Sequence, residues 1–281
     1  MAAPRRRSGW HPPGLIRSGF GFRGEVHPAG MAQPYRYSRV RLLDDDIPSA
    51  GSHAGWEMHP RYEEWLEFVF DHPVSDPAWY WDEDGPEFEA PEMDQAILIG
   101  ETFTYAGRDL ARFSDAQVNQ GLWFLSSPAL SDYGFSVKSE TVPLEIRLAA
   151  IRGIYPLYRD CFQRRCAEKL SHLDRVGGRN DLNLRTDLNP ICYMFWDVTP
   201  LGYLKGHADE VALRDAIFGI LEQTLELPHL ACKEAAIHGY GEIQYYYPEK
   251  VKEAMDRFLG TEIADEDLRT YAENAREGRI Q

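Results

Sequence analysis

The sequence predicts an all-α protein in which helical hairpins stack on one another. Apolar residues recur three and four positions apart along successive segments, which is the spacing of one face of a helix. Prolines and glycines separate these segments at short intervals, and the last third of the chain lacks the alternating pattern of strands. Because short links between amphipathic helices produce antiparallel pairs, the helical hairpin is the expected unit.

The first three predicted helices lie in the N-terminal half of the chain. The first follows Pro60, and the second spans residues 93–106 with Gly107 as its stop. The third begins at Ser114, which forms a capping-box pattern with Gln117. The apolar face of the first helix consists of Tyr62, Trp65, Leu66, Val69 and Phe70.

The middle of the chain predicts an interrupted helix and an irregular region. A helix begins near Pro143, and Pro156 falls inside its apolar pattern, where it should kink or split the helix. Residues 171–187 are rich in glycine and polar residues and are expected to be irregular. The short apolar segment 189–197 could be a helix or a strand by its length, and its helical neighbours favour a helix.

The C-terminal third has the strongest helical pattern. It predicts a helix that ends before Pro228, a second over residues 229–246, and a third from Pro248 to Gly260. A last helix is expected over residues 265–277. Apolar residues at i, i+3, i+4 and i+7 give most of these helices one face to bury.

Residues 209–260 resemble a HEAT-like repeat. The two outer helices of this stretch are about 39 residues apart, close to the period of two-helix solenoid repeats. The resemblance implies a HEAT-like α-solenoid, with an irregular α-solenoid as the alternative. Residues 119–125 and 192–197 also resemble uncharacterised bacterial helical proteins, a likeness that carries no activity with it. Small residues that let the helices approach closely are Ala231, Ala235, Ala236, Gly239 and Gly241.

The net charge of −15 is unevenly distributed along the chain. Residues 1–30 hold five arginines and one glutamate, so the remainder carries −19. We expect residues 1–30 to be a disordered basic tail, with Met31 as an alternative start, residues 31–58 an irregular extension, and residues 59–281 a single α-helical domain. An acidic domain repels phosphate backbones and attracts basic partners, so we expect a basic protein partner and no nucleic acid.

Other motifs exclude several kinds of site. The 4 cysteines form no Cys-x-x-Cys pair, which predicts reduced thiols in a cytoplasmic protein. No run approaches the roughly 18 apolar residues of a membrane helix, so we expect no membrane association.

Phosphate-binding glycine motifs are missing, and we predict no cofactor. His238 and Glu242 lie one helical turn apart and supply two metal ligands at best, so we predict no metal, with a surface ion pair or a buried histidine as the favoured alternatives.

Two aromatic segments are candidates for partner binding. The acidic connection 71–92 carries Trp79 and Trp81 at its centre, and it does not fit a calcium loop because Gly85 in the sixth position would place Tyr80 in the first. It could be an exposed loop that docks a partner or a solvated loop that its tryptophans anchor. The tyrosines before Pro248 could form a binding ridge or pack between hairpins. The candidate residues are Trp79, Trp81, Asp82, Asp84, Glu87, Tyr245 and Tyr246.

Two functions follow from these observations. The leading prediction is a non-catalytic interaction module whose acidic surface receives a basic protein, and an inhibitor or immunity-type protein would fit this charge. The alternative is a hydrolase-type enzyme with a polar site in residues 171–207, where polar and glycine residues concentrate between helices. Together with the His–Glu pair on the later helix, the polar candidates are His172, Asp174, Asp197, His207, His238 and Glu242.

Overall fold

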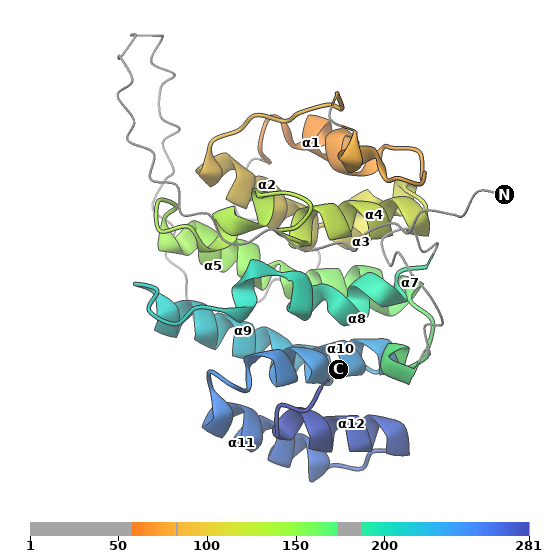
Figure 1. The fold of residues 1–281 in the computed structure, drawn as a ribbon, viewed down its shortest axis with the longest axis vertical. Helices are drawn as coiled ribbons and strands as arrows, with labels where there is room; N and C mark the ends of the chain where they lie inside the picture. Colours follow the sequence, from red (N-terminus) through yellow and green to blue (C-terminus); the bar gives the residue numbers. More distant parts are fainter. Residues whose placement is uncertain (1–57, 83, 174–186, 281) are drawn as a thin grey trace, which may run out of the picture. The chain divides into compact units, whose positions relative to one another are not determined.

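The computed structural model describes residues 58–82, 84–173 and 187–280, which belong to one compact unit, residues 55–281. These residues form helices, turns and loops, and no strand is assigned among them (Figure 1). The predicted all-α class is therefore confirmed. The predicted basic tail and nearly all of the predicted irregular extension lie outside the described residues.

The N-terminal helices follow the predicted order with one correction. The predicted stop at Gly107 is wrong, because α3 continues through this residue. A Cβ atom at Gly107 would lie 2.6 Å from the Cβ atom of Asp160, so the glycine permits close packing and does not end a helix. The capping box of Ser114 and Gln117 is present as predicted. The helices are α1 (Tyr62–Phe70), α2 (Glu92–Thr104), α3 (Ala106–Asp109) and α4 (Asp115–Ser126).

The middle helix is split, as the position of Pro156 predicts. Its first part ends at Arg152, and a π-helical stretch, η4, follows Pro156 directly. The apolar segment after residue 188 is the helix α8 (Asn189–Val198), which confirms the helical interpretation. The split helix consists of α5 (Leu144–Arg152), α6 (Ile154–Pro156), η4 (Leu157–Phe162) and α7 (Gln163–Arg165).

The C-terminal helices were all predicted, although one is shorter than expected. α10 ends at Ile243, Tyr245 and Tyr246 lie in the turn that follows, and Tyr247 is the N-cap of α11. Asp265 caps the last helix because its side chain accepts a hydrogen bond from the Leu268 N–H at 2.9 Å. The four helices are α9 (Glu210–Leu225), α10 (Leu230–Ile243), α11 (Pro248–Leu259) and α12 (Glu266–Arg276).

Contacts between the longer helices form two rows. In one row α2 packs on α5, and α5 packs on α9. In the other row α4 packs on α8, and α8 packs on α10. The hairpins α9–α10 and α11–α12 continue the series toward the C-terminus, as Figure 1 shows.

Two pairs of neighbouring helices, α8 with α10 and α2 with α5, run parallel. In the second row Cys192 contacts Ala231 and Trp196 lies against Gly239, so both helices advance in the same direction. A Cβ atom at Gly239 would lie 2.7 Å from both Trp196 and Leu221, which confirms that this small residue lets helices approach closely. In the first row Gly100 of α2 lies against Ala150 of α5, and Gly153, the C-cap of α5, lies against Thr104 of α2.

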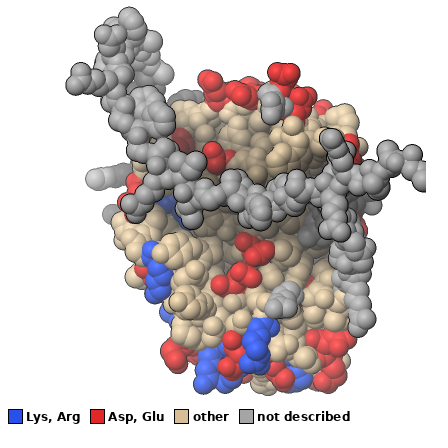
Figure 2. Space-filling model, viewed as in Figure 1, with Lys and Arg blue, Asp and Glu red and all other residues tan. Residues whose placement is uncertain are grey.

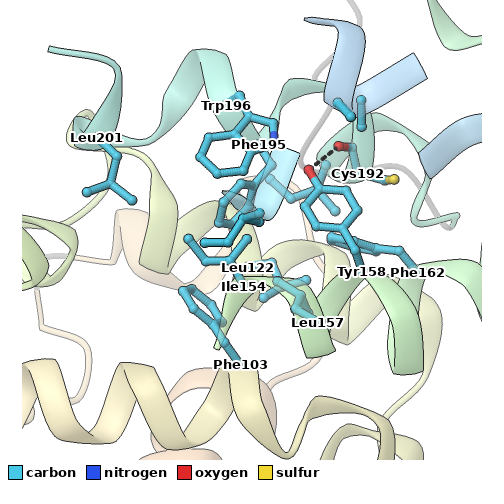
Figure 3. Close-up of a cluster of buried hydrophobic side chains, with 14 of the residues drawn as sticks. Phe103, Leu122, Ile154, Leu157, Tyr158, Phe162, Cys192, Phe195, Trp196 and Leu201 are labelled. Carbon is cyan, nitrogen blue, oxygen red and sulfur yellow. Dashed lines mark hydrogen bonds between the residues drawn. The ribbon is translucent and has the colours of Figure 1, made fainter. Parts of the chain in front are cut away.

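The interior between the two rows is aromatic and aliphatic. The Tyr158 hydroxyl donates a hydrogen bond to the Cys192 carbonyl at 3.1 Å, which joins η4 to α8 (Figure 3). Phe195 packs edge-on against Phe103 and Tyr158, so α2, η4 and α8 share one core. This rigid interior fixes the positions of the side chains at the surface.

Candidate functional site

The connection between α1 and α2 is anchored by its first tryptophan. The Trp79 ring stacks on His72 at 3.8 Å between centroids and packs against Phe124 at 4.7 Å. Phe88 is buried farther along, where the Arg61 guanidinium lies 3.9 Å from its ring centre. Trp79, a candidate for partner contact, is therefore a half-buried anchor. The second tryptophan, Trp81, keeps 55% of its surface exposed.

Four acidic residues of this connection are exposed. Asp82, Asp84, Glu87 and Glu89 lie at the surface, and within the described ranges none of them forms an ion pair with a lysine or arginine. The Asp82 carboxylate accepts a hydrogen bond from the Asp84 N–H at 3.1 Å, which shapes the turn. Residues 79–82 and 84–89 are called the acidic-aromatic loop below.

One face of the helical unit shows an uneven distribution of charge. On the face shown in Figure 2, Asp and Glu side chains have no Lys or Arg beside them at the end that carries α1, although Glu64 and Glu63 of α1 pair with Arg61 and Arg112. At the opposite end, over α11 and α12, both signs are mixed. The mixture reflects ion pairs such as Arg276 with Asp256 and Arg257 with Glu222.

The tyrosines after α10 differ in exposure. Tyr245 is 85% exposed, Tyr246 is half-buried against Tyr203, and Tyr247 is buried. Tyr203 is itself exposed, and its ring centroid lies 5.2 Å from that of Tyr246. Of the three tyrosines in the predicted ridge, only Tyr245 is exposed, and the other two pack against neighbouring side chains.

A buried glutamate organises the start of the region that was predicted to hold the polar site. The Glu234 carboxylate has no exposed surface and accepts hydrogen bonds from the backbone N–H groups of Ser171 and His172, each at 2.8 Å. The His172 Nδ1 atom lies 2.7 Å from the same carboxylate. Three hydrogen bonds thus satisfy a carboxylate that would otherwise be costly to bury.

His172 belongs to a buried polar network that joins three helices. Its ring stacks on Tyr271 of α12, whose hydroxyl is hydrogen-bonded to His238 Nδ1 at 2.7 Å and to the Tyr193 hydroxyl at 2.8 Å. Burial, with a smaller contribution from His172, lowers the pKa of His238 to about 4, so this imidazole is neutral at pH 7. Burial raises the pKa of Tyr193 to about 12. Neutral, hydrogen-bonded groups at this depth are typical of a structural network.

Two carboxylates lie beside this network at the surface. Glu242 is one helical turn beyond His238, and its Oε1 atom lies 3.7 Å from His238 Nε2. Burial and the nearby Asp197 carboxylate raise the pKa of Glu242 to about 7. Burial also raises the pKa of Asp197, although this residue is exposed. Both carboxylates are therefore destabilised in the charged form when no cation is close.

The remaining polar candidates lie elsewhere or outside the described residues. The His207 Nε2 atom is 2.6 Å from the Lys138 carbonyl and 3.8 Å from Glu140. Asp174 lies outside the described residues. The structure thus brings together His172, Asp197, His238 and Glu242 around α10, and it places His207 in a different environment.

Other kinds of site find little support in the part of the chain that the structure describes. Among those residues no group of three histidines, cysteines, aspartates or glutamates has a geometry that could hold a metal ion. No described helix is long and apolar enough to cross a membrane. A small gap between α2, α5 and α8 is lined by side chains such as Phe103, Ile151 and Phe195, with no titratable group in its lining.

Glu234, Tyr193 and Tyr271 are the network residues that sequence reasoning missed. A signal for the first was present, because Glu234 lies one turn before His238 and one turn after Ala231, on the face that α10 buries. A carboxylate on a buried helical face requires a partner. The tyrosines look like ordinary apolar positions in the sequence, so only the fold could bring their hydroxyls together.

Comparison with known proteins gives no relative for this chain: no family model, curated protein or solved structure matches it. The functional conclusion therefore depends on the geometry described above.

Proposed function

We propose that this protein is a non-catalytic interaction module that receives a basic protein partner at its acidic-aromatic loop. The observation that carries the proposal is the combination of Trp81, 55% exposed, with four neighbouring carboxylates that have no cationic partner among the described residues. Exposed tryptophans supply contact energy at interfaces, and unpaired carboxylates steer a basic partner toward them.

The contrast with the rest of the surface supports this location. Many other exposed carboxylates are neutralised by a nearby arginine, as in the pairs Arg61–Glu64, Arg165–Asp115 and Arg214–Asp215. In the acidic-aromatic loop no such pair is described. A basic partner that binds here therefore has fewer intramolecular ion pairs to break than at other parts of the surface.

The loop is also pre-organised for binding. Trp79 and Phe88 hold it to the core on either side of Trp81, and the Tyr133 hydroxyl donates a hydrogen bond to the Phe88 carbonyl at 2.8 Å. A loop that is fixed before binding loses less conformational entropy when the partner arrives.

The helical rows provide the framework in this proposal. Parallel packing of α8 on α10 and of α2 on α5 is what stacked hairpins of an α-solenoid produce, and we propose an irregular HEAT-like solenoid for this unit. An inhibitor or immunity-type protein that covers a basic effector would use such a surface. The hydrolase hypothesis stays a prediction, since His207 is remote from the network and Asp174 lies outside the described residues.

A short peptide of alternating arginine and leucine, labelled for fluorescence anisotropy, tests the proposal on the full chain. We expect saturable binding that weakens between about 50 and 500 mM salt, and no binding of the corresponding glutamate–leucine peptide. Combined substitution of Asp82→Asn, Asp84→Asn and Glu87→Gln should weaken binding about tenfold or more.

The matched control removes three carboxylates elsewhere. Glu249, Glu262 and Glu273 are exposed and unpaired within the described residues, so Glu249→Gln, Glu262→Gln and Glu273→Gln change the net charge equally. The control should retain affinity within about threefold. Equal losses in both variants, or binding that is insensitive to salt, would contradict a specific role for the loop.

A further inference from the structure

Asp197 and Glu242 lie side by side because of the register between α8 and α10. The ring of Tyr193 lies 4.4 Å from that of His238, and the two helices run parallel. Asp197 is one helical turn beyond Tyr193, and Glu242 is one turn beyond His238. The two carboxylates therefore occupy the next turn on the same side of this helix pair.

Neither carboxylate is neutralised by a basic side chain in the described part of the chain. Glu242 lies near the neutral His238, and no lysine or arginine pairs with it or with Asp197. The Glu242 side chain is 31% exposed, and Asp197 is exposed, so a ligand can reach both. Two adjacent carboxylates that repel each other favour a cation that binds between them.

A second, independent feature points to a ligand at this place. The His238 side chain is only 4% exposed, and its Nε2 atom has no hydrogen-bond partner among the described residues. This atom faces the carboxylate of Glu242 at 3.7 Å, which is too far for a hydrogen bond. A buried polar atom without a partner is costly. When His238 Nδ1 donates its proton to the Tyr271 hydroxyl, Nε2 is an acceptor, and a ligand with N–H groups would satisfy it.

We propose that Asp197, Glu242 and His238 Nε2 form a socket for an arginine side chain of the basic partner. This inference rests on the proposed function and adds a second contact to it, distinct from the acidic-aromatic loop.

A guanidinium group fits the chemistry of this socket better than other cations. It presents five N–H donors in one plane, so it can donate hydrogen bonds to both carboxylates and to the Nε2 atom of His238. It is also less strongly hydrated than an ammonium group, which lowers the cost of partial burial. A metal ion is less suitable, because no group of three metal ligands converges within the described residues.

The test uses N-acetyl-arginine amide as the probe, with N-acetyl-citrulline amide as its uncharged isostere. Backbone amide shifts of the full chain in NMR spectra should saturate at residues 196–198 and 238–243 with a Kd of about 1–10 mM for the arginine compound. The citrulline compound should cause no saturable shift. Glu242→Gln and Asp197→Asn should each weaken binding about fivefold or more, whereas Glu262→Gln should not change it.

The outcomes separate this inference from the proposed function. Absence of saturable shifts, equal shifts with citrulline, or unchanged binding in Glu242→Gln would overturn the socket, even if the loop variant still loses peptide affinity. Arginine binding that depends on Glu242 would support the socket even if the loop variant binds the peptide normally. Amide spectra of both variants that match the wild-type spectrum outside this site show that the fold is intact.

Discussion

The imidazole ring of His172 lies flat on the phenol ring of Tyr271, with centroids 4.0 Å apart and planes inclined by 11°. The two residues come from distant segments, and Glu234 holds His172 by two hydrogen bonds and the neighbouring Ser171 by a third. The ring contact ties the short 3₁₀ turn η5 (Ser171–Leu173) to α12, and the hydrogen bonds to Glu234 tie it to α10. The local order of that turn should therefore depend on one buried carboxylate.

Replacement Glu234→Gln tests this dependence. In the glutamine, an NH₂ donor replaces one carboxylate oxygen that accepts a hydrogen bond from a backbone N–H. Two donors then face each other, and one buried hydrogen bond is lost. We expect the free energy of unfolding to fall by about 2–3 kcal/mol, and hydrogen exchange at Ser171 and His172 to accelerate. The exposed Glu226→Gln serves as control and should change stability by less than about 0.5 kcal/mol. Unchanged exchange at residues 171 and 172 would refute the assigned role of Glu234.

The two tryptophans of the acidic-aromatic loop should respond differently to truncation. Trp79→Ala removes a ring that packs on His72 and Phe124, and we expect a loss of about 2–4 kcal/mol in urea unfolding. Trp81→Ala removes a mostly exposed ring and should cost less than about 1 kcal/mol while weakening binding of the arginine–leucine peptide. Similar losses of stability in both variants would mean that the loop is anchored differently.

Close helix packing predicts opposite effects for two glycines. Gly239→Ala would place a methyl group 2.7 Å from Trp196 and Leu221, so we expect a loss of about 1–3 kcal/mol. Gly219→Ala in α9 meets no atom within 4 Å, and alanine favours the helix, so we expect a gain of about 0.5–1 kcal/mol. Thermal unfolding of both variants measures this difference, and a stabilising Gly239→Ala would contradict the observed spacing of α8 and α10.

The half-buried Glu101 predicts a pH dependence of stability. Burial raises the pKa of Glu101 to about 7, although the His59 backbone N–H opposes this shift. Because the folded-state pKa lies above the unfolded value of 4.5, the folded protein binds this proton more tightly. The contribution of this proton to the free energy of unfolding is therefore fully present below pH 4.5 and is lost as the pH rises to about 7.

Glu101→Gln removes this titration. Relative to the wild type, the variant should gain about 1–2 kcal/mol between pH 4.5 and pH 8, a value reduced for partial exposure of the side chain. Urea unfolding at several pH values gives the comparison, with Glu273→Gln as an exposed control that should show no such trend. A constant difference between Glu101→Gln and wild type across this range would be inconsistent with a raised pKa.

Local patterns predicted the helices well where one face is apolar and the ends carry strong signals. α1, α9 and α11 follow from spacing and proline positions, and the capping box of α4 follows from Ser114 and Gln117. Gly107 was misread because its role depends on Asp160, a tertiary contact that the local sequence does not contain.

The candidate site was less predictable because it depends on exposure and register. Composition identified the acidic-aromatic loop, but it could not show that Trp79 packs inward while Trp81 faces solvent. His238 and Glu242 were paired correctly by their helical spacing. Asp197 joins them only because α8 lies parallel to α10, which no motif reveals.

Carboxyl footprinting tests the location of the partner site most directly. The full chain is labelled with a carbodiimide and an amine, with and without the arginine–leucine peptide, and each carboxylate is quantified by mass spectrometry. We expect labelling of Asp82, Asp84 and Glu87 to fall several-fold when the peptide is bound, while Glu249, Glu262 and Glu273 stay unchanged. Protection that is equal at all six residues, or absent from the acidic-aromatic loop, would contradict the proposed binding surface.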